Sequence, residues 1–149
     1  MLAVAIKFAA ECHQNQVDKG GTPYILHPLT VMSYLETDDL ELMCIAVLHD
    51  VIEDCHVTGI QLRQLGMSER VVAGVVALTR KNKETHTEKM NRLTSNIDAV
   101  RVKLCDLRHN CDIRRLKTTL TEKDVARLKV YHRMQIELTE VLSKHKYTE

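Results

Sequence analysis

The stretch LELMCIAVLHDVIED, from Leu40 to Asp54, decides the fold, because a mostly apolar segment runs directly into four ionisable side chains. On one continuous helix, His49 lies beside Glu53 and Asp50 lies beside Asp54, and all four fit within an arc of about 140°. The remaining residues of the segment are mainly apolar, so we expect this polar arc to face the interior of the protein. Burying unpaired carboxylates costs much free energy. A divalent cation bound by the imidazole and carboxylate groups would offset this cost.

Two further segments supply partners for this arc. A His-Asp pair alone is weak evidence, because such pairs arise by chance and the charged end of a helix is usually only solvated. TPYILHP, however, places His27 at a helix start, and KLCDLRHN places Asp106 within an apolar stripe. A single buried His or Asp of this kind more often has a structural role, held by hydrogen bonds, than a role as a metal ligand. Together His27, His49, Asp50 and Asp106 form a candidate site of two histidines and two carboxylates on three helices, with room for the waters that a catalytic metal needs.

Length and composition limit the class of protein. The chain has 149 residues, which predicts one domain, 1–149, with a sizeable core. Its 21 basic and 20 acidic residues give a net charge of +1, which provides no general field for nucleic acid or a membrane surface. The 5 cysteines form no C-x-x-C pair, so free thiols and a cytoplasmic location are expected. No run approaches the roughly 18 apolar residues of a membrane span.

The composition also favours an all-α fold. Aromatic residues make up 3% of the chain, Trp is absent, and there are only 5 Gly and 2 Pro. We expect a bundle of about seven to eight helices. The polar segment 81–89 is expected to be a loop or an exposed helix start. The expected helices are 2–16, 27–35, 40–54 after a cap at Asp38 or Asp39, 58–66 with a Thr58–Gln61 capping box, one opened by Ser68, one over 100–113, and one from a Thr121–Asp124 cap to about 142.

The three motifs GTPYILHP, LHDVIED and KLCDLRHN, in this order, resemble those of the HD-domain metal phosphohydrolases. Within these, the likeness is strongest to the hydrolase domains of the RelA/SpoT family and to the small alarmone hydrolases, and it extends from about Ala3 to Leu142. The resemblance implies an HD-domain helical bundle. It also implies that a metal-activated water hydrolyses the 3′-pyrophosphate of the guanosine alarmones (p)ppGpp, giving GDP or GTP and pyrophosphate.

The resemblance further implies roles for single residues. It implies metal ligands, usually for manganese, at His27, His49, Asp50 and Asp106. It implies an acidic pair that positions and activates the attacking water, Glu53 and Asp54. It implies substrate contacts at Lys19, Asn110, Arg127 and Tyr131. We expect His13 to be structural and His109 to help shape the site.

One departure from the family pattern keeps other functions open. RelA/SpoT enzymes commonly carry Arg-Lys in the substrate loop, where the Arg packs on guanine, whereas this chain has Asp18-Lys19. A carboxylate cannot stack on a purine as a guanidinium can. The alternatives are an HD phosphohydrolase for another nucleotide phosphate, such as a nucleoside phosphate or an NADPH-type substrate, and a nucleotide-binding module without catalysis. The intact Glu53–Asp54 pair favours an enzyme with a small-molecule nucleotide as its partner, and the sequence leaves the oligomeric state open.

Overall fold

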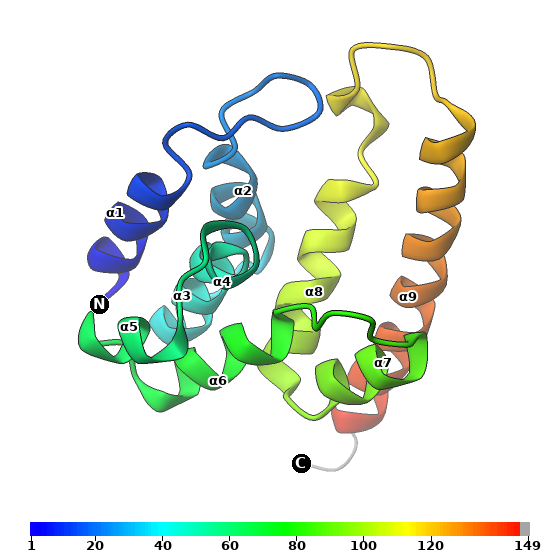
Figure 1. The fold of residues 1–149 in the computed structure, drawn as a ribbon. Coiled ribbons are helices and arrows are strands. Elements are labelled where there is room, and N and C mark those ends of the chain that lie inside the picture. Colours follow the sequence, from blue (N-terminus) through cyan, green and yellow to red (C-terminus); the bar gives the residue numbers. More distant parts are fainter. Residues whose placement is uncertain (147–149) are drawn as a thin grey trace.

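The structure, a computed structural model, describes residues 1–146, with the backbone alone for residue 146, and this part of the chain is all-helical (Figure 1). It contains nine α-helices, one short 3-10 helix and no strand beyond a single bridge between Val17 and Pro23. In chain order the elements are α1 (Leu2–Cys12), α2 (Leu26–Tyr34), α3 (Leu40–Leu48), α4 (Val51–Cys55), α5 (Gly59–Gln64), α6 (Glu69–Leu78), α7 (His86–Thr94), α8 (Ile97–Asn110), the 3-10 helix η1 (Ile113–Arg115) and α9 (Glu122–Lys146).

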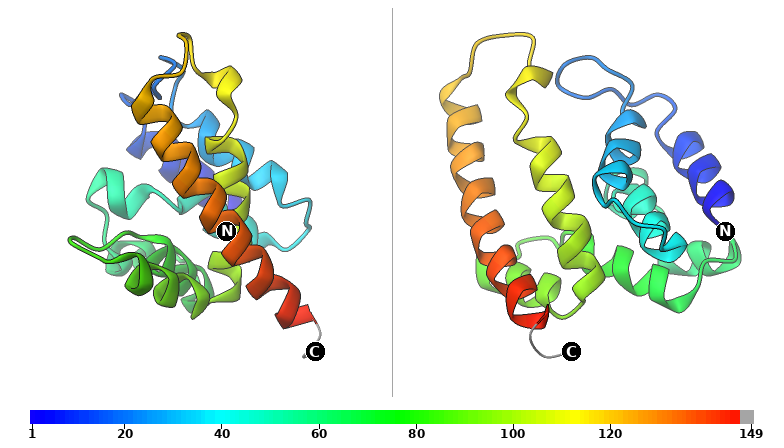
Figure 2. Two further views of the ribbon diagram at one scale, coloured as in Figure 1. Left: turned by 90° about the vertical axis from the view of Figure 1, so that its right-hand side faces the viewer. Right: turned by 180° about the vertical axis from the view of Figure 1, so that it is seen from behind.

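Helix α3 forms the centre of the core. It packs against α1, α2, α6 and α8, and its buried side chains include Leu42, Ile45 and Leu48. The contact with α6 is close because Gly74 faces Ile45, and a Cβ atom on Gly74 would lie 2.6 Å from the Ile45 Cδ1 atom. On the other side of the molecule α9 lies along α8, as both views in Figure 2 show, and buries Met134 there. The helices that carry the candidate site residues are thus held on one shared core.

Side-chain caps define where several helices begin. The carboxylate of Asp39 accepts hydrogen bonds from the first backbone N–H groups of α3, and the Ser68 hydroxyl accepts one at the start of α6. Thr58 and Gln61 form the predicted capping box of α5. The predicted cap before α9 is also present, with reciprocal hydrogen bonds between Thr121 and Asp124. These starts are confirmed because caps satisfy backbone donors through contacts three residues apart, which a sequence displays directly.

The prediction of one continuous helix over 40–54 is wrong. Helix α3 ends at Leu48, α4 begins at Val51, and His49 and Asp50 form the turn between them. The reason is local: the His49 ring Nδ1 donates to the carbonyl oxygen of Ala46 at 2.7 Å. A continuing helix would offer that acceptor to the backbone N–H of Asp50. The four polar residues therefore do not share one helical arc.

Other boundaries differ by smaller amounts. Helix α1 ends at Cys12 rather than at residue 16, because the chain turns back and the Tyr24 N–H donates to the carbonyl oxygen of Gln16. The segment left as a loop or helix start forms α7, which a capping box between Thr85 and Glu88 opens. Helix α8 begins three residues earlier than predicted and stops at Asn110, before η1. The split of the third predicted helix and the addition of α7 bring the count above seven to eight.

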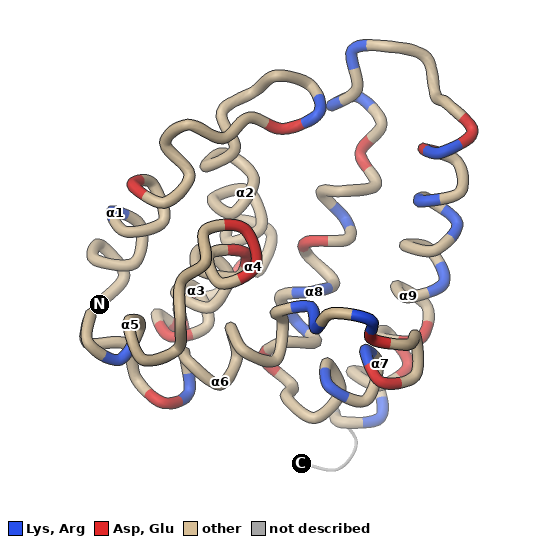
Figure 3. Tube along the Cα trace, viewed as in Figure 1, with Lys and Arg blue, Asp and Glu red and all other residues tan. Residues whose placement is uncertain are grey.

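Charge is unevenly placed on this bundle. Figure 3 shows acidic residues on α4 and a series of basic residues along α9. Although α9 has 25 residues, it is strongly charged, and within residues 1–146 no helix is long and apolar enough to cross a membrane.

Candidate active site

The four predicted metal ligands converge in the core of the bundle. His27 comes from the first turn of α2, His49 and Asp50 from the turn between α3 and α4, and Asp106 from the last turns of α8. His27 Nε2 lies 3.1 Å from Asp106 Oδ1 and 3.6 Å from Asp50 Oδ2. His49 Nε2 lies 2.9 Å from Asp50 Oδ2 and 3.7 Å from Asp106 Oδ1. Each of the two imidazole nitrogens therefore lies within 3.7 Å of an oxygen of both carboxylates.

The orientation of His49 is fixed by the backbone. Because its Nδ1–H donates to Ala46, Nε2 is the ring nitrogen left to face the two carboxylates. Nε2 is fully buried and has no hydrogen-bond partner with suitable geometry, in spite of the short distance to Asp50. Burial lowers the pKa of His49, but the Asp50 and Asp106 carboxylates outweigh it and raise that pKa well above its ordinary value. The cluster thus attracts a positive charge to this nitrogen.

His27 is held by a second imidazole. Its Nδ1 lies 2.7 Å from His109 Nδ1, and the two rings stack at a centroid distance of 4.9 Å. Burial and the nearby Arg115 lower the pKa of His109 to about 4, so its ring is neutral and can accept the His27 Nδ1–H. This arrangement leaves the His27 Nε2 lone pair facing the cluster. Ligating histidines commonly donate their other N–H in this way.

Both carboxylates are also oriented by hydrogen bonds. The Tyr24 hydroxyl donates to Asp50 Oδ2 at 2.6 Å. Lys103 Nζ donates to Asp106 Oδ2 at 2.5 Å, and Asn110 Nδ2 donates to Asp106 Oδ1 at 2.6 Å. Burial raises the pKa of Asp106, but Lys103 and the two imidazoles hold it well below its ordinary range. Asp106 is therefore ionised and keeps Oδ1 on the side of the histidines.

The donor set fits a divalent cation. Ligand atoms that bind at about 2.2 Å and at right angles to one another are about 3.1 Å apart, and the four nitrogen–oxygen distances, 2.9–3.7 Å, are close to that value. His27, His49 and Asp50 alone offer three ligand atoms within 4.8 Å of one another. A mixed imidazole and carboxylate set suits Mn²⁺, Fe²⁺ or Zn²⁺. The unpartnered Nε2 of His49 is the atom that a cation would satisfy.

The predicted acidic pair lies outside this cluster. Glu53 and Asp54 are exposed on α4, contrary to the expectation of a buried arc. The Glu53 carboxylate accepts from the backbone N–H of Arg80 at 3.0 Å. The Asp54 carboxylate accepts from Gln16 Nε2 at 2.8 Å. Of the two, Asp54 is close enough to Tyr24 to raise the pKa of that phenol, together with the larger effects of burial and Asp50.

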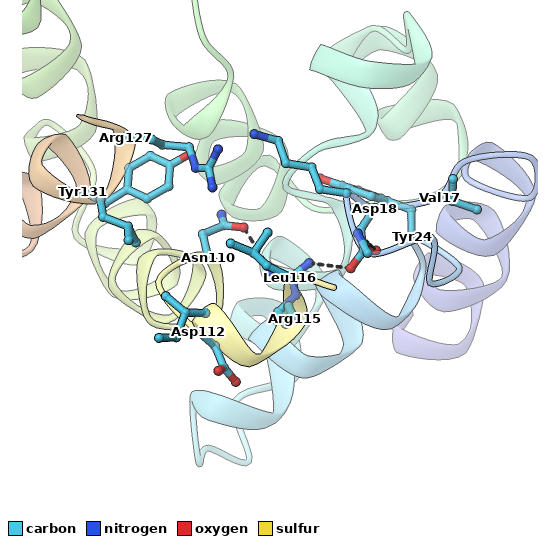
Figure 4. Close-up of a pocket in the computed structure, with 13 residues that line it drawn as sticks. Val17, Asp18, Tyr24, Asn110, Asp112, Arg115, Leu116, Arg127 and Tyr131 are labelled. Carbon is cyan, nitrogen blue, oxygen red and sulfur yellow. Dashed lines mark hydrogen bonds and ion pairs between the residues drawn. The ribbon is translucent and has the colours of Figure 1, made fainter. Parts of the chain in front are cut away.

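A cavity of about 230 Å³ adjoins the cluster and contains the four predicted substrate-binding residues. Figure 4 shows Arg127 and Tyr131 of α9 on one wall, Asp18 and Tyr24 on the opposite wall, and Asn110 between them. The lining residues are Val17, Asp18, Lys19, Gly20, Tyr24, Asn110, Asp112, Ile113, Arg115, Leu116, Arg127, Leu128 and Tyr131. Tyr24 and Asn110 belong to the cavity and also bond to cluster carboxylates, so the cavity opens onto the cluster.

Three residues with evident roles were missed by the sequence analysis. Tyr24 and Lys103 lie within the quoted motifs TPYILHP and KLCDLRHN, and their places there were the available signal. Arg115 carries no such signal. It reaches the cavity from η1 and forms a 3.0 Å ion pair with Asp18. His13 is buried and bonds to Gln16, in agreement with a structural role, and His109 supports His27.

The chain is similar in sequence to several known proteins. The chain is 32% identical over 122 residues to a GTP pyrophosphokinase of Myxococcus xanthus, covering 71% of this chain and 16% of that protein. It is 35% identical over 121 residues to the bifunctional (p)ppGpp synthase/hydrolase SpoT of Escherichia coli K12, covering 73% and 17%. It is 40% identical over 83 residues to the guanosine-3′,5′-bis(diphosphate) 3′-pyrophosphohydrolase MESH1 of Danio rerio, covering 50% and 46%. The chain thus spans about 16–17% of the length of the first two of these relatives.

The fold and the family are shown by two further matches. The solved structure described as a metazoan ortholog of SpoT that hydrolyses ppGpp matches with a TM-score of 0.74 at 22% identity, covering 96% of this chain and 92% of that one. At this identity the match shows the shared fold. The model of the HD domain family covers residues 5–132, which include all four predicted ligands. The chain therefore belongs to the HD domain family.

Proposed function

We propose that this chain hydrolyses the 3′-pyrophosphate of the guanosine alarmones (p)ppGpp, giving GDP or GTP and pyrophosphate, with Mn²⁺ as its cofactor. The observation that carries this proposal is the cluster of two histidines and two carboxylates, which opens onto a cavity lined by basic and aromatic side chains. The relatives named for this reaction support the substrate. The free state of all five cysteines supports a cytoplasmic setting, where thiols stay reduced.

Within this proposal, different side chains bind the metal, accept the proton and position the helices. His27, His49, Asp50 and Asp106 would hold the metal, which when bound supplies a water of lowered pKa. Asp54, beside Tyr24 at the rim of the cluster, accepts the proton of the attacking water. Glu53 acts by positioning, because its carboxylate fastens α4 to the segment after α6.

The bond changes define what the cavity must stabilise. The oxygen of the attacking water bonds to the phosphorus attached to the 3′-oxygen, and the bond between that phosphorus and the 3′-oxygen breaks. The 3′-oxygen takes up a proton and becomes the hydroxyl of GDP or GTP, while the former water oxygen leaves in pyrophosphate. Negative charge spreads over the phosphoryl oxygens during this step. Lys19 and Arg127, which line the cavity, are the cations placed to offset it, and Tyr131 offers a ring to the nucleotide.

Product analysis tests the proposal. The purified chain is incubated with ppGpp and Mn²⁺, with and without a chelator, and the nucleotides are resolved by ion-exchange chromatography. We expect GDP and pyrophosphate to appear in equal amounts, and the chelator to stop their release. His49→Ala should lose both bound Mn²⁺ and turnover, because it removes the unpartnered ring nitrogen. Intact ppGpp after incubation with the Mn²⁺-loaded chain would refute the proposed substrate.

A second candidate substrate has an observation in its favour. Asp18 occupies the loop position at which the resemblance implies a guanine-packing Arg, and here it forms an ion pair with Arg115. This arrangement favours another nucleotide phosphate, such as a nucleoside phosphate or an NADPH-type dinucleotide. The same incubation with these compounds, followed by an orthophosphate assay, separates the two. Orthophosphate from one of them, with ppGpp left intact, would select the second candidate.

A further inference from the structure

The loop over 17–22 is fastened to the chain that follows α8. Asp18 Oδ2 accepts from Arg115 at 3.0 Å, and Asp18 Oδ1 accepts from the backbone N–H groups of Gly20 and Thr22. Gly20 lies directly against the backbone of Arg115, and a Cβ atom there would clash with the Arg115 carbonyl oxygen. Asp18 therefore orders its own loop and holds the Arg115 guanidinium in one place.

The same guanidinium reaches the end of α8. Arg115 Nη1 donates to the carbonyl oxygen of His109 at 3.1 Å. It also donates to Asn110 Oδ1 at 3.3 Å (Figure 4). The other end of the Asn110 amide, Nδ2, donates to Asp106 Oδ1 at 2.6 Å. Both ends of this amide are thus engaged, and its orientation is set by a donor on one side and an acceptor on the other.

We propose that Arg115 is a positioning residue that couples the substrate loop to the metal cluster, through a continuous chain of contacts from Asp18 to Arg115 to Asn110 to Asp106. Asn110 then acts on the ligand Asp106 rather than mainly on the nucleotide. This inference rests on the metal site of the proposed function, but it does not depend on the identity of the substrate.

The physical reason lies in what the guanidinium prevents. Without Arg115, Asn110 Oδ1 loses its donor, so the Asn110 side chain is held at one end only and can turn away from Asp106, while Asp18 loses its ion-pair partner. Asp106 Oδ1 would then lose the hydrogen bond that keeps it beside His27 and His49. Loss of such supporting contacts typically lowers metal affinity about 10–100-fold.

Metal affinity in the absence of substrate tests this role. Mn²⁺ binding to the full chain is measured by isothermal titration calorimetry for the wild type, Arg115→Met and Arg114→Met. Arg114 is the matched control, because it is the neighbouring residue of η1, is 86% exposed and pairs only with Asp112 among the described residues. We expect Arg115→Met to weaken Mn²⁺ binding about tenfold and Arg114→Met to leave it unchanged. Wild-type affinity in Arg115→Met would overturn the proposal.

A double-mutant cycle tests whether Arg115 acts through Asn110. If it does, Arg115→Met combined with Asn110→Ala binds Mn²⁺ no more weakly than Asn110→Ala alone, because the coupling has already been removed. Full additivity of the two effects would overturn the proposal. Arg115→Lys keeps the charge but not the planar fork that contacts Asp18 and Asn110 together, so it should rescue only part of the affinity. Far-UV circular dichroism and Tm in chelator confirm that each variant is folded.

These outcomes can be told apart from failure of the proposed function. A chain that binds Mn²⁺, shows the expected non-additivity and leaves ppGpp intact would retain the coupling and refute the substrate. A chain that cleaves ppGpp but shows additive effects would retain the function and refute the coupling. If the wild-type chain bound no Mn²⁺, the coupling to a metal ligand would also be refuted.

Discussion

Residues close in sequence around the turn after α3 have contrasting environments. His49 is 4% exposed and faces the cluster, whereas Glu53 and Asp54, a few residues later, are exposed on α4. The turn at His49 and Asp50 produces this contrast, because it redirects the backbone between two short helices. The segment 48–54 thereby supplies two members of the buried cluster, His49 and Asp50, and two carboxylates that solvent reaches.

The role of the acidic pair can be tested by neutral isosteres. We expect Asp54→Asn to lower kcat by at least about 10²-fold, because an amide cannot accept the proton of water. Mn²⁺ affinity should not change, since Asp54 is not among the converging ligand atoms. Glu53→Gln is the matched comparison: its amide oxygen can still accept from the Arg80 N–H, so its loss of kcat should be smaller. Turnover by Asp54→Asn at the wild-type rate would remove the role assigned to it.

At the scale of residues, the sequence predicted which side chains lie together better than it predicted their supports. The proximity of His27, His49, Asp50 and Asp106 could be expected because each lies in a short motif whose polar residues interrupt an apolar pattern. Arg115 could not, since its partner Asp18 lies 97 positions away and nothing local to either residue indicates the pair. The burial of the polar arc was wrongly predicted for Glu53 and Asp54, because helical periodicity does not reveal that a ring N–H of His49 ends the helix.

The close packing of α3 on α6 depends on Gly74, which has no side chain. We expect Gly74→Ala to lower the free energy of unfolding by about 1–3 kcal/mol, because the added methyl would overlap Ile45. The better helix propensity of Ala offsets part of this loss, by about 1 kcal/mol. Urea unfolding measures the change. Ala73→Ser, on the exposed face of the same helix, is the control and should stay within about 0.5 kcal/mol of wild type. A Gly74→Ala variant as stable as wild type would show that Ile45 can move aside.

The segment before α7 provides a pH-sensitive contact. The side chain of Glu84 is 4% exposed and pairs with Arg92, which also donates to the carbonyl oxygen of Ala77 at the end of α6. The ion pair with Arg92 lowers the pKa of Glu84 from its ordinary value. A carboxylate with a lowered pKa stabilises the folded chain above its unfolded value, and this contribution is lost as the pH falls through the folded value.

Replacement of this carboxylate should therefore change how stability depends on pH. We expect Glu84→Gln to be less stable than wild type by about 1–3 kcal/mol at pH 7 and to lose less further stability between about pH 5 and pH 3. Thermal unfolding across this range, with Glu88→Gln in the exposed capping box as a comparison, provides the measurement. Parallel pH profiles for wild type and Glu84→Gln would contradict the assignment.

At the scale of helices, capping residues predicted where helices begin better than apolar periodicity did. The starts of α3, α5, α6 and α9 were predicted because each depends on a contact between residues close in sequence. The start of α7 carries the same kind of signal, the Thr85–Glu88 capping box, but the segment was left undecided because it is polar and its single buried residue, Leu93, lies near the end. Packing against α8 completes this helix.

Metal binding should stabilise the molecule as a whole, because its ligands come from three separate parts of the chain. At a free Mn²⁺ concentration of about 100 times Kd, binding contributes about 2.7 kcal/mol to the folded state. For a chain of this size we expect a rise in Tm of about 5–10 °C. Differential scanning calorimetry with Mn²⁺ and with chelator measures it. His49→Ala should show little rise, and an equal rise in that variant would mean that the stabilising ion binds elsewhere.

The long separation between His27 and His109, 82 positions along the chain, has a consequence for biosynthesis. A ribosome that adds about 5–20 residues per second needs roughly 4–16 s to make the intervening segment. For most of that interval the nascent chain lacks Lys103, Asp106 and His109. Translation itself therefore sets the earliest moment at which the cluster of histidines and carboxylates can form.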